Sequence, residues 1–92
     1  MGCAEYKAPK GVIRVALDIE NGRISRASIT GDFFMYPEEA LIELENGLLN
    51  VRAERNAVEE AVRRFYERTG ARTPMVEAHH WVEALMRAVN ED

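Results

Sequence analysis

Residues 11–20, GVIRVALDIE, alternate between large apolar side chains and small or polar ones. The large apolar members are Ile13, Val15, Leu17 and Ile19. A period of two residues is typical of a β-strand with one buried face. Asn21 and Gly22 follow directly, and this pair is a strong signal for a tight hairpin turn. The segment therefore predicts an antiparallel sheet whose apolar face must be covered by another layer.

Two registers are possible for this hairpin. A two-residue loop at residues 21–22 would pair Leu17 with Arg26, which brings a charge onto the apolar face. A three-residue loop would instead pair Val15 with Ala27, and it would place the glycine where a bulge needs a left-handed residue. We predict the three-residue loop, because it keeps the apolar residues on one face of the sheet.

The hairpin is expected to lie in a three-stranded antiparallel meander. The return strand should run over residues 23–30 and end at Gly31 and Asp32. Residues 3–8 can form an edge strand before it, with a turn at residues 9–11. The proline of that turn fits an edge position, because it has no N–H to give to a neighbouring strand.

Three helices are predicted to cover one face of the sheet. Pro37 suits the first position of one helix. Residues 53–68 are expected to form a second helix, which stops at Gly70. A third helix is expected to begin at residues 73–74 or near His80. The apolar side chains at helical spacing are Ala40, Leu41, Leu44 and Leu48, then Ala57, Val58, Ala61, Val62, Phe65 and Tyr66, then Ala78, Val82, Leu85, Met86 and Val89. Strands followed by helices predict an α+β fold in two layers, as a single domain over residues 1–92.

Charge and composition argue against several classes of function. The formal net charge is −4 and the pI is about 5.2, so nucleic-acid binding is not expected. No apolar run approaches the roughly 18 residues of a membrane helix. The single cysteine, Cys3, excludes an internal disulfide. We expect a soluble protein of the cytoplasm that binds neither nucleic acid nor membranes.

No motif of a self-contained enzyme is present, and we predict no catalytic residue. His79 and His80 are adjacent, so on a helix they would point about 100° apart and could not share one ion. His79 with Glu83 would supply two ligands, fewer than a stable metal site needs. The carboxylates at the start of the first helix, Glu38, Glu39, Glu43 and Glu45, are explained by the helix dipole and solvent. We therefore predict no metal site.

Residues 33–36, FFMY, place four large apolar side chains in a row, which neither a strand nor a short loop readily buries. In one interpretation Phe33 and Met35 fill the gap between the sheet and the first helix, and Phe34 and Tyr36 cover the edge of the sheet. In the other interpretation, part of the stretch stays exposed as a docking patch for another protein.

The order of these segments is informative. It comprises Lys10-Gly11, the turn at Asn21-Gly22, the end Gly31-Asp32-Phe33-Phe34, the proline and acidic helix start, and the helix AERNAVEEAVRRFYE. The set, over residues 7–69, resembles the small C-terminal accessory domain of lipoate–protein ligases. Some microorganisms, mostly archaea, encode this domain as a separate small subunit, and the length of the chain is similar to that arrangement.

The resemblance implies an accessory subunit that forms a heterodimer with a large catalytic subunit. The large subunit would hold lipoate, ATP and Mg, make lipoyl-adenylate, and transfer lipoyl to a lysine of carrier domains in 2-oxoacid dehydrogenases and the glycine cleavage system. The small subunit would bind no cofactor alone, but the activation step would need it. The residues expected to contact the partner and complete its site are Lys7, Lys10, Gly31, Asp32, Phe33, Phe34 and Tyr36.

The hairpin and helices also resemble the iron–sulfur scaffold architecture. In that family cysteines stand where this chain has Lys10 and Asp32, so a cluster would lack its ligands here. Two alternatives stay open beside the ligase subunit. One is a non-catalytic adaptor in sulfur or iron–sulfur metabolism, and the other is a homodimer that buries its apolar patch on itself.

Overall fold

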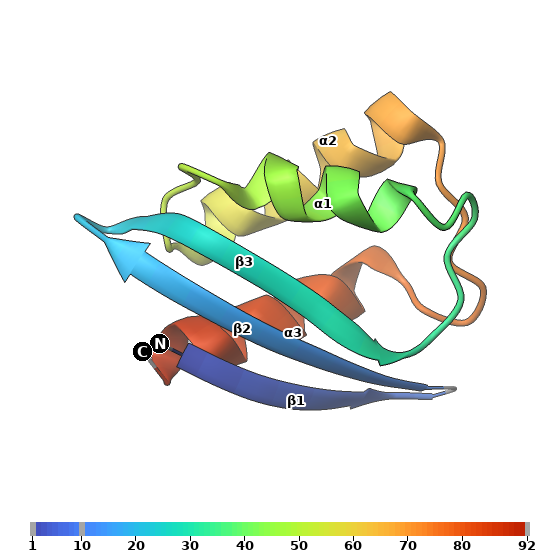
Figure 1. Ribbon diagram of the computed structural model, residues 1–92, viewed down its shortest axis with the longest axis horizontal. Helices are drawn as coiled ribbons and strands as arrows, with labels where there is room; N and C mark the ends of the chain where they lie inside the picture. The colour runs from blue at the N-terminus through green and yellow to red at the C-terminus, as the bar shows by residue number, and fades with distance from the viewer. Residues whose placement is uncertain (1, 10, 92) are drawn as a thin grey trace.

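The computed structural model describes residues 2–9 and 11–91, which form a sheet with helices on one face (Figure 1). The elements are β1 (Gly2–Ala8), β2 (Gly11–Glu20), β3 (Arg23–Asp32), α1 (Ala40–Leu48), α2 (Arg55–Thr69) and α3 (Ala78–Asn90). The strands are antiparallel in the order β1-β2-β3. Helix α3 packs on β1 and β2, α1 packs on β3, and α2 packs on both other helices. The predicted α+β meander is confirmed.

The predicted register of the central hairpin is wrong by two residues. Val15 lies opposite Ile29 and not opposite Ala27. Residues 21–22 form a two-residue turn with φ angles of 54° and 76°. Ser25 is an extra residue of β3 with no Cα pairing partner in β2, although its hydroxyl donates to the carbonyl of Asp18. With the two-residue turn alone, the polar residues of β3 would face the core. The bulge shifts the pairing by one more residue, so that the apolar residues of β3 face the core.

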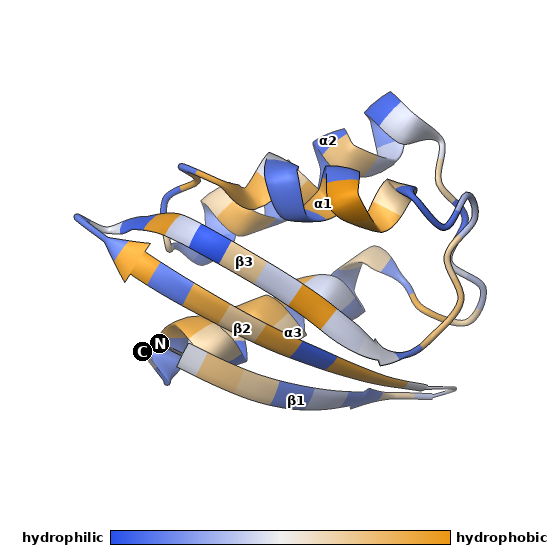
Figure 2. Cartoon of the chain, in the orientation of Figure 1, coloured by the Kyte–Doolittle hydropathy of each residue, from blue (hydrophilic) through white to orange (hydrophobic). Residues whose placement is uncertain are grey.

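The hydrophobic core lies between the sheet and the helices. Orange and blue segments alternate along β2 in Figure 2, as the sequence pattern predicted. The largest fully buried side chains are Ile13, Leu17, Ile24 and Ile29 from the sheet, with Leu44, Leu48, Val58, Val62, Phe65, Trp81 and Leu85 from the helices. Burial of each such side chain contributes about 1.5–3 kcal/mol. Trp81 was missing from the predicted inward face of the third helix, and Ala78, which was included, is exposed.

Helix α1 begins at Ala40, so the predicted start at Pro37 is three residues too early. The peptide bond between Tyr36 and Pro37 is cis. The amide of Ala40 donates to the carbonyl of Pro37 across 3.0 Å, which makes residues 37–39 a turn that leads into the helix.

Helix α2 ends before Gly70, whose φ of 63° is the left-handed stop that the sequence predicted. Helix α3 begins at Ala78, so a start at residues 73–74 is wrong. The later start, with Met75 and Val76 in a loop, is close to the structure. None of the helices in residues 2–9 and 11–91 has the length and apolar character needed to cross a membrane.

Candidate functional site

The four side chains of residues 33–36 point alternately toward the core and toward solvent. Phe33 is half-buried and Met35 is 5% exposed, whereas Phe34 is 65% exposed and Tyr36 is 51% exposed. The segment leaves β3 in an extended path, so it keeps the alternation of a strand after the sheet has ended. Two of the four side chains are therefore core, and two stand on the surface.

Phe33 packs against the third helix. Its ring lies 5.0 Å from the ring of Trp81 at an angle of 89°, the edge-to-face arrangement that aromatic pairs favour. The sequence predicted Phe33 in the gap beside the first helix, so its aromatic partner corrects that interpretation. Trp81 in turn donates a hydrogen bond of 2.7 Å to the hydroxyl of Tyr66 on α2. Burial raises the pKa of Tyr66 above its ordinary value.

Phe34 and Tyr36 form a stacked pair on the surface. Their ring planes differ by 3° and their centres lie 6.4 Å apart. They border a groove of about 450 Å³, which is lined by Ile29, Thr30, Gly31, Phe33, Phe34, Met35, Tyr36, Glu38 and Leu41. A groove with exposed aromatic rings is a surface that another protein can cover.

The loop that carries the stacked pair is held in place by the loop before α3. The amide of Tyr36 donates to the carbonyl of Arg72, and the amide of Arg72 donates to the carbonyl of Tyr36, each across 2.8 Å. The two loops lie side by side at one end of the molecule (Figure 1). Tyr36 is therefore anchored by its backbone while its ring stays exposed, which is a preorganised arrangement for binding.

The other predicted site residues lie at the same end of the sheet. Lys7 is opposite Val12, and Val12 is opposite Asp32, so the two charged residues share the outer face with one strand between them. Gly31 pairs with Ile13. Lys10 lies outside the described residues. Lys7, Gly31 and Asp32 are thus brought close to the aromatic pair, and their contact with a partner stays a prediction.

The backbone at this end of the sheet is unusually crowded. Gly31 has a φ of 147°, and a Cβ atom placed on it would lie 2.1 Å from the carbonyl oxygen of Val12. A Cβ atom on Gly11 would lie 2.0 Å from the carbonyl oxygen of Asp32. Real Cβ atoms do not approach that closely, so glycine is required at both positions. The path of the chain into the aromatic loop depends on them.

A cluster of potential metal ligands occurs at the start of α3. Atoms of Glu77, His79 and His80 lie within 4.8 Å of one another, so the prediction that the two adjacent histidines point too far apart to share an ion is wrong. However, Nδ1 of His80 accepts the backbone N–H of Glu77 across 2.8 Å, and the Glu77 carboxylate accepts the amide of His80. With Nδ1 occupied, a neutral His80 carries its proton on Nε2 and has no free lone pair. The cluster is thus a helix cap, and Glu83, the other ligand considered, pairs with Arg55 at 2.7 Å.

The acidic residues of α1 are not all simple solvent-facing charges. Glu45 accepts the amide of Ile29 on β3 across 2.8 Å and is half-buried. Glu43 faces Arg68 of α2 at 3.8 Å. The predicted explanation by dipole and solvent is therefore incomplete for these two, because each has a partner on another element.

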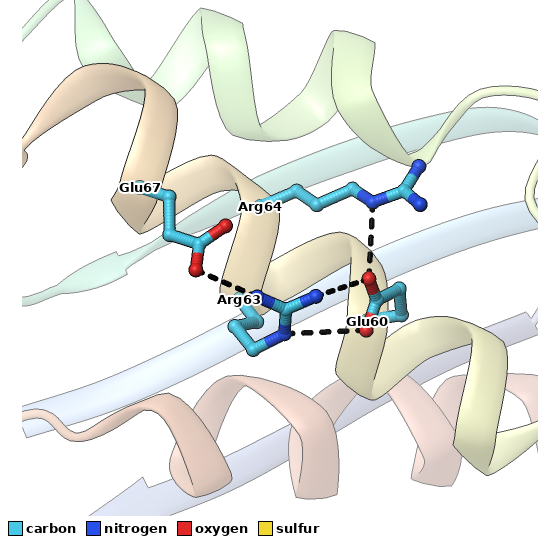
Figure 3. A network of polar contacts seen from close by, with 4 residues as sticks. All are labelled: Glu60, Arg63, Arg64 and Glu67. Carbon is cyan, nitrogen blue, oxygen red and sulfur yellow. Dashed lines mark hydrogen bonds and ion pairs between the residues drawn. The ribbon is translucent and has the colours of Figure 1, made fainter.

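The outer face of α2 carries a network of exposed ion pairs (Figure 3). Arg63 binds Glu60 and donates to Glu67 across 2.6 Å, and Nε of Arg64 donates to Glu60 across 3.1 Å. The hydrogen bond from Arg63 is the main cause that lowers the pKa of Glu60. Solvent-exposed pairs of this kind contribute little to stability.

Comparisons with known proteins agree with one another. Residues 4–75 match the family described as "Bacterial lipoate protein ligase C-terminus". "Lipoate-protein ligase A subunit 2" of Thermoplasma acidophilum is 41% identical over 80 residues, which are 87% of this chain and 82% of that protein. A chain from the solved structure of an archaeal lipoylation system of the same organism, a bi-partite lipoate protein ligase and its E2 lipoyl domain, matches with a TM-score of 0.84 and 38% identity. The match covers 90% of this chain and 91% of the chain from the solved structure.

Proposed function

Because the chain belongs to the lipoate protein ligase C-terminal family, we propose that it is the small, accessory subunit of a two-subunit lipoate–protein ligase. The observation that carries the proposal is the match to a subunit 2 over four-fifths of that subunit's own length, with the fold retained. The likeness is to a subunit of a bi-partite ligase, so the partner is a large catalytic subunit, and the carrier of lipoate is an E2-type lipoyl domain.

The chemistry of such a ligase needs ATP. The carboxylate of lipoate attacks the α-phosphate of ATP, pyrophosphate leaves, and lipoyl-adenylate forms. The amine of the carrier lysine then attacks the acyl carbon, and AMP leaves. Within the described residues, the groove beside Phe34 is lined by the carboxylate of Glu38, which would repel a triphosphate. We infer that ATP, Mg and lipoate bind to the large subunit.

The contribution of this chain is a rigid surface for the large subunit. Phe34 and Tyr36 are the kind of aromatic side chains that dominate binding energy at interfaces. The backbone bridge to Arg72 fixes them before the partner arrives, so little conformational entropy is lost on binding. We infer that Lys7 and Asp32 make polar contacts at the margin of this pair.

A reconstitution experiment tests the proposal. The chain is mixed with the large subunit, ATP, Mg and lipoate, and release of pyrophosphate is measured with and without each protein. We expect pyrophosphate only when both proteins are present. Full activity of the large subunit without this chain, or turnover by this chain alone, would overturn the assignment.

A further inference from the structure

The negative charge of the protein is concentrated in one segment. Residues 31–51 include Asp32, Glu38, Glu39, Glu43 and Glu45 but no lysine, arginine or histidine. The rest of the chain has twelve basic and eleven acidic residues, so outside this segment the formal net charge is +1. The segment that contains α1 and its two flanking loops is therefore acidic, and Arg68 and Arg72 of neighbouring elements lie beside it.

Most of the exposed apolar surface lies on the same segment. Among the described residues, the exposed large apolar side chains are Phe34, Tyr36, Ile42, Leu49 and Met75. Four of these five belong to residues 31–51. Ile42 lies on α1, and its side chain points away from the buried stripe of Ala40, Leu44 and Leu48. Leu49 directly follows the helix, in extended backbone.

The groove beside the aromatic pair reaches α1. Leu41 lines the groove beside Phe34 and Tyr36, and it is the neighbour of Ile42 on α1. The surface therefore runs from the aromatic loop onto the outward face of the helix, and α1 lies next to that loop in Figure 1. We name it the acidic-rimmed surface, and it comprises Phe34, Tyr36, Ile42 and Leu49 with Asp32, Glu38 and Glu39.

We propose that the acidic-rimmed surface is the binding site for the large subunit, and that the facing surface of that subunit has apolar pockets rimmed by lysine and arginine. This inference rests on the proposed function and specifies its interface. It extends the predicted contact from the end of the sheet along the whole of α1.

Three of the carboxylates are available to a partner. Glu45 is engaged by the amide of Ile29 and Glu43 faces Arg68. For Asp32, Glu38 and Glu39, all exposed, the described residues show no ion pair. Free carboxylates around an apolar patch attract a basic surface and repel another copy of this chain, which would bring the same charges together. Charge complementarity thus favours the large subunit over a homodimer.

The edge of β3 favours docking through side chains. The amide of Ile24 donates to Val51 across 2.8 Å, the amide of Asn50 donates to Ile24 across 2.7 Å, and Glu45 occupies the amide of Ile29. An added strand would have to displace these contacts. The partner is therefore expected to pack on the side chains of α1 and the aromatic loop rather than to pair with β3.

The two parts of the surface should affect binding in different ways. Rim charges accelerate encounter and lose their effect in salt, whereas desolvated apolar side chains slow dissociation. We expect the association rate constant to fall about tenfold between 50 and 300 mM NaCl. Glu38→Lys with Glu39→Lys should lower the same constant by about tenfold at low salt, while Glu59→Lys with Glu91→Lys, outside this surface, is the control of equal charge and should leave it unchanged.

The decisive experiment measures binding of the immobilised large subunit to the complete chain by surface plasmon resonance. Ile42→Ser with Leu49→Ser should raise Kd about 30-fold, mainly through faster dissociation, with the circular dichroism spectrum unchanged. A Kd within about twofold of the parent would overturn the inference, and pyrophosphate release by that same complex would show that the proposed function still stands. If the parent chain itself does not bind, the proposed function fails as well. A dimer of the chain alone that these two substitutions abolish would mean that a second copy occupies the surface, which also overturns the inference.

Discussion

The indole N–H of Trp81 donates to the hydroxyl oxygen of Tyr66, and the two atoms are 2.7 Å apart. That hydroxyl lies 2.7 Å from the hydroxyl of Thr73, which donates its own proton to the carbonyl of Val76. Each hydroxyl has one proton, so the direction of donation runs from the indole to the loop carbonyl. The hydrogen bonds join α2, α3 and the loop between them behind the aromatic surface.

Tyr66→Phe should destabilise the fold by about 1–3 kcal/mol, because it leaves the fully buried Trp81 N–H without an acceptor. Urea denaturation followed by circular dichroism measures the free energy of unfolding. Tyr6→Phe is the matched control, since no hydrogen bond of the Tyr6 hydroxyl is found within the described part of the chain. A loss at Tyr66 no larger than the loss at Tyr6 would contradict the role assigned to the hydrogen bond.

The stability of the protein should fall as the pH rises above about 10. Burial raises the pKa of Tyr66 above its ordinary value of 10.0, so the unfolded chain loses this proton at a lower pH than the folded chain. Between the two pKa values the folded state binds more protons, and stability therefore decreases with pH. Below the unfolded value the contribution is complete. The free energy of unfolding, measured at pH 9 and pH 11, should decrease less in Tyr66→Phe than in the parent chain.

Gly31→Ala should be among the most damaging single substitutions, with a loss of roughly 3 kcal/mol or more. The new methyl group would meet the carbonyl oxygen of Val12 in a backbone with φ of 147°. Gly70→Ala is the control that has backbone strain without a steric clash. Gly70 has a φ of 63°, but its new methyl group would meet no atom within 4 Å beyond its immediate chain neighbours. That variant should lose only about 1 kcal/mol. If thermal denaturation shows equal losses of stability for Gly31→Ala and Gly70→Ala, then the backbone at residue 31 has moved to relieve the clash with Val12.

Glu45 should protect the edge of β3. In Glu45→Ala the amide of Ile29 loses its acceptor, so we expect a loss of about 1–3 kcal/mol. Glu45→Gln keeps a side-chain oxygen at the same place and should retain most of the stability. Hydrogen exchange at the Ile29 amide reports the contact directly. Exchange should accelerate in the alanine variant and change little in the glutamine variant, and equal rates in both would exclude the contact.

The sequence predicted the fold correctly where buried residues recur at a regular spacing within one strand or helix. The alternation of β2 and the apolar stripes of the helices specify which face is inward, whatever the register of pairing. The bulge was missed although β3 contains a signal for it. Ile24 and Ala27 are both inward-facing apolar residues with a spacing of three, which a regular strand cannot place on one face. The backbone of Ile24 also bonds to Asn50 and Val51, a contact too distant in sequence to foresee.

The candidate site was only partly predictable for the same reason. Four apolar side chains in a row indicated that not all could be buried, and one interpretation placed Phe33 and Met35 inward, but the sequence did not decide between that interpretation and an exposed docking patch. Phe33 is directed inward by Trp81, which follows it by 48 positions. The helix cap formed by Glu77 and His80 was also missed, because it depends on where α3 starts. Tertiary contacts decided these points, and local pattern did not.

Phe33→Ala and Phe34→Ala should change different properties of the protein, although the residues are neighbours of the same type. Phe33→Ala removes the contact with Trp81 and should lower the free energy of unfolding by about 2 kcal/mol or more. Phe34 is 65% exposed, so its removal should change stability by less than about 0.5 kcal/mol. Loss of an aromatic anchor should instead weaken binding of the large subunit by about 2 kcal/mol or more, close to 30-fold in Kd. Urea denaturation and the binding measurement on both variants check this division. Normal binding and normal pyrophosphate release with Phe34→Ala would remove Phe34 from the interface, because the unchanged fold leaves no other explanation for the result.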